Sequence, residues 1–359
     1  MRGFKNIIGN NWIKLQQSLL ECAINLGFIY IDIPSIQSLN IFNSTGEDLN
    51  KEMFIFKYRD ESVCLTPEQT APILEYIKEN KKQNLVYFSK CWRKERPQKG
   101  RYREFRQFGV EAFLKNGEKI TLFLIKKIID QLKLENVTLY INNIGTTKER
   151  EKYIEVLKNY FMNCHLSNIS KSRIHTNVLR ILDSKEPEDE IAKNNAPFIG
   201  DFLTVEQQNY TKEISDFCTQ IQLKYEIKHS LVRGLEYYNG LVFELVNNEN
   251  LTLIGGGSYM IDNVQAFGFG AGVERLYENI YKDENFSTNI PGLILLEPYY
   301  DVFNHIKDFY FLGYKATDGL REAFKLNLKK VILIGKEWID GNIIIKNLDN
   351  GQQEIYNIK

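Results

Sequence analysis

Cationic side chains are concentrated in one short part of this chain. Residues 81–106 hold ten Lys or Arg against two Glu, although the whole protein of 359 residues has a formal net charge of zero. Trp92, Tyr102 and Phe105 stand among these arginines. A guanidinium group can hold phosphate while an aromatic ring stacks on a base. The segment therefore predicts a site for a nucleotide or a nucleic acid, with a solvated charged hairpin as the alternative.

The order of residues within 93–111 favours a built ligand site. Alternate residues of a strand share a face, so Arg93 and Glu95 would point together. Phe105, Gln107 and Glu111 would also share a face. One side would then offer an arginine for phosphate, a ring for a base and polar groups for a small ligand.

A carboxylate precedes this segment at Glu68. Thr66-Pro-Glu-Gln has the form of a capping box with proline at the first helical position, which predicts a helix from residue 67. Glu68 would lie in the first turn, close to the positive end of the helix dipole. It either stabilises that helix end alone or also receives an ammonium group from a ligand.

Arg233-Gly-Leu-Glu-Tyr237-Tyr238 combines a cation with two phenolic hydroxyls. Arginine stays protonated when partly buried, so Arg233 can stabilise charge that develops on phosphorus. A structural turn with core tyrosines is the alternative, and the segment by itself leaves both open.

A glycine-rich region follows, with a run at 255–257 and single glycines at 268, 270 and 272 before Arg275. Glycine lets the backbone approach a ligand closely, although glycine packing alone could explain the pattern. The region lacks a strand–GxGxxG–helix fingerprint and a Walker sequence, which argues against Rossmann and P-loop folds.

Both helices and strands are predicted for the segments that must position these residues. Apolar periodicity predicts helices at 10–27, 120–134 and 205–222, and antiparallel strands at 85–95 and 105–113. Strands that follow strands, with helices outside, indicate an α+β domain over residues 1–285, with an irregular insertion at about 163–202. Residues 290–359 alternate strands and helices, including a helix at 300–311, and predict a small separate α/β domain.

The composition is that of an ordinary soluble globular protein, and the cysteines and the N-terminus lead us to expect a cytoplasmic location. The five cysteines are odd in number and never form a CxxC pair, which fits a reducing compartment. Cys164-His165 has no second ligand pair at a suitable spacing, so we expect no metal site. The N-terminus does not read as a targeting signal, and no apolar run is long enough to cross a membrane.

Together these segments resemble the class II aminoacyl-tRNA synthetases, and within them the histidyl-tRNA synthetase family. Arg93-Lys-Glu-Arg-Pro-Gln-Lys-Gly-Arg-Tyr-Arg-Glu-Phe is nearly identical to the second class motif, and Gly268-Phe-Gly-Ala-Gly-Val-Glu-Arg275 resembles the third. Leu231-Val-Arg-Gly-Leu-Glu-Tyr-Tyr-Asn resembles the first histidine signature, and Leu179-Arg-Ile-Leu-Asp-Ser-Lys-Glu-Pro187 resembles the family's insertion. The helix ending at Gly27 and the strand through Pro34 resemble the dimer-forming first motif.

This resemblance covers nearly the whole chain. It implies the class II antiparallel sheet flanked by helices, with a small C-terminal α/β domain. It also implies a homodimer that joins L-histidine to tRNA(His) in two steps through histidyl-adenylate, using ATP and the Mg2+ bound with it.

The resemblance also implies a role for each site residue. Arg93 would hold the α-phosphate, Glu95 the adenine edge or ribose, and Arg101 and Arg275 the outer phosphates, while Phe105 stacks on adenine. Glu68, Thr70 and Gln107 would fix the amino and carboxylate ends of histidine. Glu111 and Tyr238 would bind the imidazole, in a pocket that also contains Tyr237 and Tyr259. Arg233 would lie where the carboxylate attacks phosphorus, and Arg96, Gln98 and Lys99 would meet the tRNA acceptor end.

Elementary chemistry agrees with these roles. Attack on the α-phosphate needs alignment and charge stabilisation more than acid–base catalysis, so arginines and Mg2+ suffice. An imidazole needs a hydrogen-bond acceptor and a donor, which a Glu and a Tyr supply. A buried pocket of this kind strongly rejects amino acids that lack those groups.

The chain departs from the family in two places. The second histidine signature, Gly-Gly-Arg-Tyr-Asp, reads here as Gly256-Gly-Ser258-Tyr259-Met260, so the support of the substrate pocket is expected to differ. The anticodon-binding domain is short and lacks its final helix, so anticodon recognition is expected to use fewer contacts.

Two other functions are weighed. One is a catalytically silent histidine-sensing paralogue, like the regulatory subunit of ATP phosphoribosyltransferase; the presence of Arg93, Arg233 and Arg275 argues against it. The other is a nucleic-acid-binding module using the basic hairpin, which would leave Glu68 and Glu111 without a purpose.

Overall fold

The computed structural model describes residues 3–4, 9–43, 47–97, 100–232, 237–261, 264–281, 291–299, 301–302, 305–306, 309–325 and 328–358. The chain divides into two compact units, Met1–Ile280 and Tyr281–Lys359. Each unit has its own sheet and its own apolar core.

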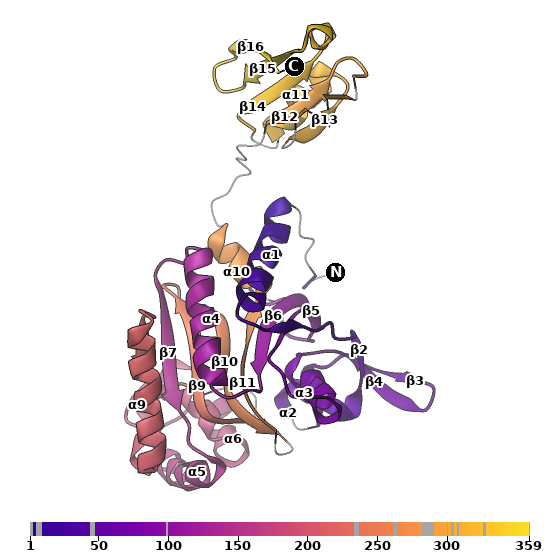
Figure 1. The fold of residues 1–359 in the computed structure, drawn as a ribbon. Coiled ribbons are helices and arrows are strands. Elements are labelled where there is room, and N and C mark those ends of the chain that lie inside the picture. The colour runs from indigo at the N-terminus through magenta and orange to yellow at the C-terminus, as the bar shows by residue number, and fades with distance from the viewer. Residues whose placement is uncertain are drawn as a thin grey trace. The chain divides into compact units, whose positions relative to one another are not determined.

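The first unit is built on an eight-stranded sheet (Figure 1). Its strand order is β1-β5-β6-β11-β10-β9-β7-β8. The two edge pairs, β1 with β5 and β7 with β8, are parallel, and the five pairs between them are antiparallel. The strands are β1 (Ile29–Tyr30), β5 (Leu85–Trp92), β6 (Glu104–Ala112), β7 (Val137–Asn143), β8 (Tyr225–Ile227), β9 (Tyr238–Asn247), β10 (Thr252–Ile261) and β11 (Val264–Gly272). The expected antiparallel sheet flanked by helices is confirmed.

Helices cover both faces of this sheet. The side chains of α1 (Asn10–Ile24), α4 (Gly117–Gln131), α9 (Val205–Gln220) and α10 (Val273–Ile280) form one core with the sheet. In α4, Leu122, Ile125 and Ile128 recur every three residues, which places them on one buried stripe. The opposite face packs on α3 (Thr70–Glu79), α5 (Thr147–Met162), α6 (Asn168–Thr176), α7 (Leu179–Leu182) and α8 (Glu190–Asn194).

Two local predictions are corrected. The helix expected from residue 67 begins at Thr70, and Thr66 does not cap it, because its hydroxyl donates to the carbonyl oxygens of Pro34 and Ser35. The carboxylate of Glu68 takes over and accepts the first two amide hydrogens, from Thr70 and Ala71. The insertion expected to be irregular is mostly helical, with α6, α7, α8 and the 3-10 turns η2 (Pro187–Asp189) and η3 (Ile199–Phe202).

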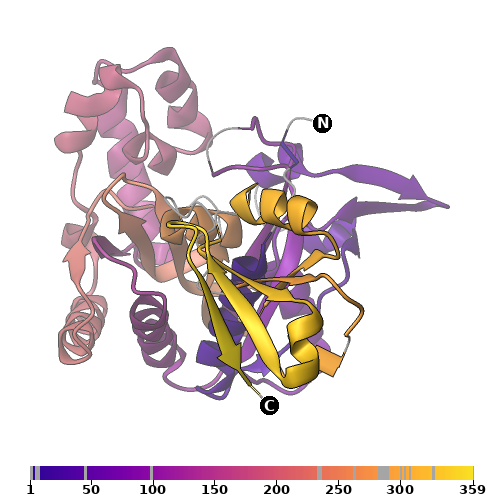
Figure 2. The same ribbon diagram turned by 90° about the horizontal axis from the view of Figure 1, so that it is seen from above.

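A small sheet extends from this unit. It has the order β2-β4-β3, with β2 (Ile36–Ser38), β3 (Ile55–Tyr58) and β4 (Glu61–Leu65). The 3-10 turn η1 (Leu39–Phe42) and the helix α2 (Glu47–Glu52) lie between β2 and β3 in the chain. The β3–β4 hairpin projects away from the large sheet in both ribbon views (Figures 1 and 2).

The second unit has a five-stranded sheet of order β13-β12-β14-β15-β16. Its elements are β12 (Gly292–Leu295), β13 (Tyr310–Gly313), α11 (Ala316–Lys325), β14 (Lys330–Ile334), the 3-10 turn η5 (Lys336–Asp340), β15 (Asn342–Asn347) and β16 (Gln353–Asn357). Side chains of α11 pack on one face of the sheet, and Trp338 is buried on the other. The helix expected at 300–311 is wrong at its end, where a strand begins at Tyr310, and part of that range lies outside the described residues.

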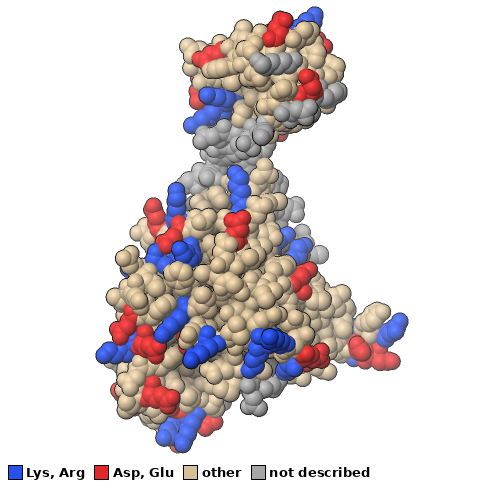
Figure 3. All heavy atoms as spheres, viewed as in Figure 1, with Lys and Arg blue, Asp and Glu red and all other residues tan. Residues whose placement is uncertain are grey.

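The charged residues do not form a patch of one sign on the face shown in Figure 3, where basic and acidic side chains are interspersed. In the described part of the chain, no helix has both the length and the apolar character needed to cross a bilayer.

Candidate active site

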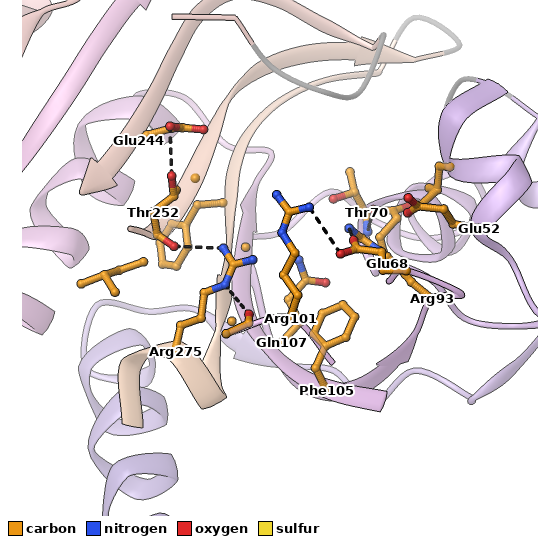
Figure 4. Close-up of a pocket in the computed structure, with 18 of the residues that line it drawn as sticks. Glu52, Glu68, Thr70, Arg93, Arg101, Phe105, Gln107, Glu244, Thr252 and Arg275 are labelled. Atoms are coloured by element: carbon orange, nitrogen blue, oxygen red, sulfur yellow. Dashed lines mark hydrogen bonds and ion pairs between the residues drawn. The ribbon is translucent and has the colours of Figure 1, made fainter. Parts of the chain in front are cut away.

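A cleft of about 740 Å3 lies against the large sheet (Figure 4). Residues from widely separated segments of the first unit line it, from Leu49 to Arg275. The cleft brings together twelve of the side chains singled out in the sequence: Glu68, Thr70, Arg93, Glu95, Arg101, Phe105, Gln107, Glu111, Tyr237, Tyr238, Tyr259 and Arg275.

Four other predicted residues are not among these twelve. Arg96 is exposed and does not line the cleft. Gln98, Lys99 and Arg233 lie outside the described residues.

Strand register explains why these side chains meet. On β6, Gln107 and Glu111 lie opposite Gly272 and Gly268 of β11, so all four positions face the same side of the sheet. The same row continues to β10, where Gly257 pairs with Gly268. Glycines therefore form much of the sheet surface beneath the cleft, which is its floor.

The floor must be free of side chains because polar groups lie directly over it. A Cβ atom at Gly268 would be 1.9 Å from Oε2 of Glu111, and one at Gly270 would be 2.1 Å from Nε2 of Gln107. The glycine-rich segments thus lie within strands, and their absent side chains leave space for Gln107 and Glu111.

One end of the cleft is an acidic pocket, formed by Glu68, Thr70, Glu111 and Tyr259. The Thr70 hydroxyl donates to Oε1 of Glu111 at 2.7 Å, and the Tyr259 hydroxyl donates to Oε2 at 2.7 Å. The backbone amides of Thr70 and Ala71 donate to the two oxygens of Glu68 at 2.8 and 2.9 Å. Hydroxyl and amide donors therefore fix the position of both carboxyl groups.

Burial sets the protonation of this pocket. Glu68 and Glu111 are only 2% and 1% exposed. Burial raises the pKa of Glu111 to about 8, with a further rise from the charge of Glu68, although the bonds from Tyr259 and Thr70 oppose it. Burial also raises the pKa of Glu68, against its amide donors and the charge of Arg93. Burial therefore favours the protonated form of Glu111, against the hydroxyl donors.

Three tyrosines enclose the acidic pocket. The ring of Tyr237 lies 4.9 Å from that of Tyr238 and 5.4 Å from that of Tyr259, measured between ring centroids. All three are at most 8% exposed. The pocket is a small aromatic enclosure with carboxyl groups, which suits a ligand that is both flat and polar.

The other end of the cleft is an arginine cluster, formed by Arg93, Arg101 and Arg275. The guanidinium of Arg93 lies 5.4 Å from the centroid of the Phe105 ring. Glu95 lies between two of the arginines, 3.6 Å from Nη1 of Arg93 and 3.7 Å from Nη1 of Arg101. This end offers positive charge beside an aromatic face, as a nucleotide requires.

Arg275 connects two segments of the cleft (Figure 4). Its Nε donates to the carbonyl oxygen of Gly100 at 2.6 Å, and its Nη1 donates to that of Thr252 at 3.1 Å. The Thr252 hydroxyl donates in turn to Glu244 at 3.1 Å. The arginine is therefore fixed by backbone groups on both sides.

The sequence did not predict some of the residues that line the cleft. Arg173 of α6 and Arg180 of α7 reach the cleft from the insertion, and Glu244 reaches it from β9. Arg180 lies within the segment that resembles the family's insertion, which was the one available signal. Nothing in the sequence connects Arg173 or Glu244 with the cleft, because their proximity follows from helix docking and strand register.

The two altered residues of the second histidine signature lie on the other face of β10. Ser258 and Met260 line a separate cavity of about 540 Å3 with Tyr210 of α9. Only Tyr259, between them, faces the acidic pocket. The altered residues therefore do not line the cleft.

The described residues contain no group of three or more His, Cys, Asp or Glu side chains that could hold a metal ion. Mg2+ is usually bound by one or two carboxylates together with substrate phosphates. The cleft fits that pattern, because Glu95 and Glu244 lie near the arginine cluster.

Comparisons with known proteins agree with this geometry. The family model described as histidyl-tRNA synthetase matches residues 10–276. Histidine–tRNA ligase of Ureaplasma parvum is 32% identical over 398 residues, covering 97% of this chain and 94% of the relative. Histidine–tRNA ligase of Mycoplasma mycoides is 34% identical over 388 residues, covering 95% and 92%.

A solved structure supports the same assignment. Apo histidyl-tRNA synthetase of S. aureus superposes with a TM-score of 0.69 at 25% identity, covering 99% of this chain and 96% of that chain. The family model spans most of the chain, and the relatives match it nearly end to end. The chain therefore belongs to the histidyl-tRNA synthetase family.

Proposed function

We propose that this protein activates L-histidine with ATP and transfers it to tRNA(His). One observation carries the proposal: a single cleft is lined by a buried acidic pocket around Glu111 and by three arginines, of which Arg93 lies beside Phe105. A small polar amino acid and a nucleotide would meet between them. The names of the relatives, histidine–tRNA ligases, support the same reaction.

The acidic pocket is the proposed histidine site. Glu111 and Tyr238 bind the imidazole, and Tyr237 and Tyr259 enclose it. Glu68, Thr70 and Gln107 bind the amino and carboxylate groups. The depth of Glu111 supports this assignment, because a buried partner group discriminates strongly against side chains that cannot satisfy it.

The arginine cluster is the proposed ATP site. Arg93 binds the α-phosphate and Phe105 stacks on adenine, with Glu95 at the adenine edge or ribose. Arg101 and Arg275 bind the outer phosphates. Glu95 or Glu244 would supply a carboxylate to the Mg2+ that accompanies ATP, and the bound ion would neutralise phosphate charge.

The reaction needs alignment and positive charge. The histidine carboxylate forms a bond to the α-phosphorus, and pyrophosphate leaves with the bridging oxygen. Arg233 and Arg93 stabilise the charge of that transition state. The terminal ribose hydroxyl of the tRNA then takes the acyl group and AMP leaves.

The remaining partners follow from the family. Arg96, Gln98 and Lys99 meet the tRNA acceptor end, and the second unit is a shortened anticodon-binding domain. The enzyme works as a homodimer through its first class motif. We also propose a cytoplasmic location, which the five unpaired cysteines support.

The test is exchange of pyrophosphate into ATP that depends on histidine. The wild type is expected to catalyse it, and Arg233→Ala is expected to abolish it. Arg321→Ala, which removes an exposed arginine of the second unit, should leave exchange unchanged. Absence of exchange in the wild type would overturn the enzymatic assignment and favour the histidine-sensing paralogue.

A further inference from the structure

Gly3 packs against the segment that carries Arg93 and Arg101, two arginines of the cluster. The carbonyl oxygen of Gly3 accepts a hydrogen bond from the backbone N–H of Arg103 at 2.7 Å. The carbonyl oxygen of Arg103 accepts in turn from the backbone N–H of Arg93 at 3.0 Å. Gly3 thus continues a row of backbone bonds that leads directly to Arg93 in the cleft.

The contact at Gly3 leaves no room for a side chain. A Cβ atom on Gly3 would lie 2.9 Å from Cγ of Pro97 and 2.9 Å from Cγ of Arg103. Gly3 also has φ +86°, a conformation that residues other than glycine adopt only with strain. Both the backbone geometry and the space at this position require glycine.

Two other contacts fix the same segment. The backbone N–H of Lys94 donates to the carbonyl oxygen of Glu52 at 2.6 Å. The side chain of Arg275 holds Gly100. The segment that contains Arg93 and Arg101 is therefore held by three contacts, with Gly3, Glu52 and Arg275.

We propose that Gly3 is a positioning residue for ATP use: it holds the backbone at Arg103 so that Arg93 and Arg101 are aligned for the phosphates. This inference rests on the proposed function of those arginines. Gly3 does not line the cleft, so its effect passes through the backbone. The acidic pocket takes its side chains from residues 68–70, β6 and β10, whereas Gly3 packs on Pro97 and Arg103, which are close in the chain to Arg93 and Arg101.

The test compares two glycines with nearly the same backbone strain. Gly351 of the second unit has φ +74° and nothing within 4 Å of its added Cβ, so Gly351→Ala introduces a similar backbone strain without the crowding. We expect Gly3→Ala to lower kcat/KM for ATP by about tenfold to a hundredfold in pyrophosphate exchange, since displacements near 1 Å are that costly. The KM for histidine should change less than the ATP parameters, although the charge of Arg93 also acts on Glu68, and Gly351→Ala should leave both parameters unchanged.

A double-mutant cycle with Pro97 tests the crowding itself. Pro97→Ala removes the ring atom that an alanine at position 3 would meet, so Gly3→Ala should cost less in that background. If Gly3→Ala lowers the melting temperature but leaves the ATP parameters like those of Gly351→Ala, the contact is merely structural and the proposal is wrong.

Calorimetric titration of the same variants with ATP separates this proposal from the proposed enzyme function. A wild type that lacks exchange but binds ATP would overturn the function alone. Equal ATP affinity in the wild type and Gly3→Ala, together with equal ATP kinetics, would overturn the role of Gly3.

Discussion

Glu111 couples the stability of the empty enzyme to pH. Its pKa of about 8 in the folded chain lies above the ordinary value of 4.5, because the folded carboxyl is buried. Its stabilising contribution is complete below pH 4.5 and is lost as pH rises through 8. Relative to Glu111→Gln, the wild-type free energy of unfolding should fall by on the order of 1 kcal/mol per pH unit in that window, measured by urea unfolding at about pH 5.5 and about pH 7.5.

The matched control for this prediction is Glu75→Gln. Glu75 is an exposed carboxylate paired with Lys78 at 2.8 Å, so its replacement should keep the wild-type pH dependence. Identical pH dependence in the wild type and Glu111→Gln would mean that Glu111 is already ionised in the folded enzyme at neutral pH.

Gly270 tests the role of the glycine floor. The three atoms nearest to the methyl group of Gly270→Ala would all belong to the side chain of Gln107, so the substitution should displace that amide and raise the KM for histidine by about tenfold or more. Gly272→Ala adds a methyl group on the same face of β11, at an ordinary 3.6 Å from Arg275, and should leave that KM unchanged. Equal KM values for both variants in pyrophosphate exchange would remove Gln107 from the histidine site.

At the scale of elements, the sequence predicted those features that depend on local pattern. The strands around residues 85–112 and the hairpin arrangement of the arginines were found because alternation and charge are visible in the chain itself. The start of α3 was wrong because Thr66 bonds to Pro34 and Ser35, which are distant in sequence. Local capping chemistry could not anticipate that competing tertiary contact.

The residues of the site also divide into those that local motifs predicted and those whose position depends on tertiary structure. Glu68, Glu111 and Arg275 stand in recognisable motifs, and the cleft contains all three. The location of Ser258 behind the sheet depends on strand register, and the reach of Arg173 depends on how α6 packs. Neither is encoded in a short pattern of residues.

Asp189 holds the insertion together. Its carboxylate accepts hydrogen bonds from the hydroxyls of Ser167, Ser170 and Ser184, and it has no exposed surface. Burial alone would raise the pKa of Asp189, but these bonds outweigh it and lower the pKa. Asp189→Asn should destabilise the insertion by about 1–3 kcal/mol and increase its cleavage in limited proteolysis.

Glu190→Gln is the control for the insertion. Glu190 is exposed and pairs with Lys193 at 3.0 Å, so its loss should not change the cleavage rate. Equal protection of the wild type and Asp189→Asn would show that the apolar core around Ile174 and Ile181 holds the insertion without the carboxylate.

At the scale of the whole molecule, all described residues that line the cleft belong to the first unit. Each unit buries its own core, and the apolar clusters of the second unit contain no residue of the first among the part of the chain that the structure describes. Chemistry and the proposed anticodon recognition are therefore assigned to separately folded parts of one chain.

Truncation after residue 281 tests this division. The shortened chain should fold and keep pyrophosphate exchange, because it retains the acidic pocket and the arginine cluster. Its charging of tRNA(His) should fall by about tenfold or more, since anticodon contacts of even about 1.4 kcal/mol amount to that factor. Unchanged charging would show that the second unit is dispensable for tRNA selection. Loss of exchange in a chain that still melts cooperatively would show that the cleft depends on the second unit.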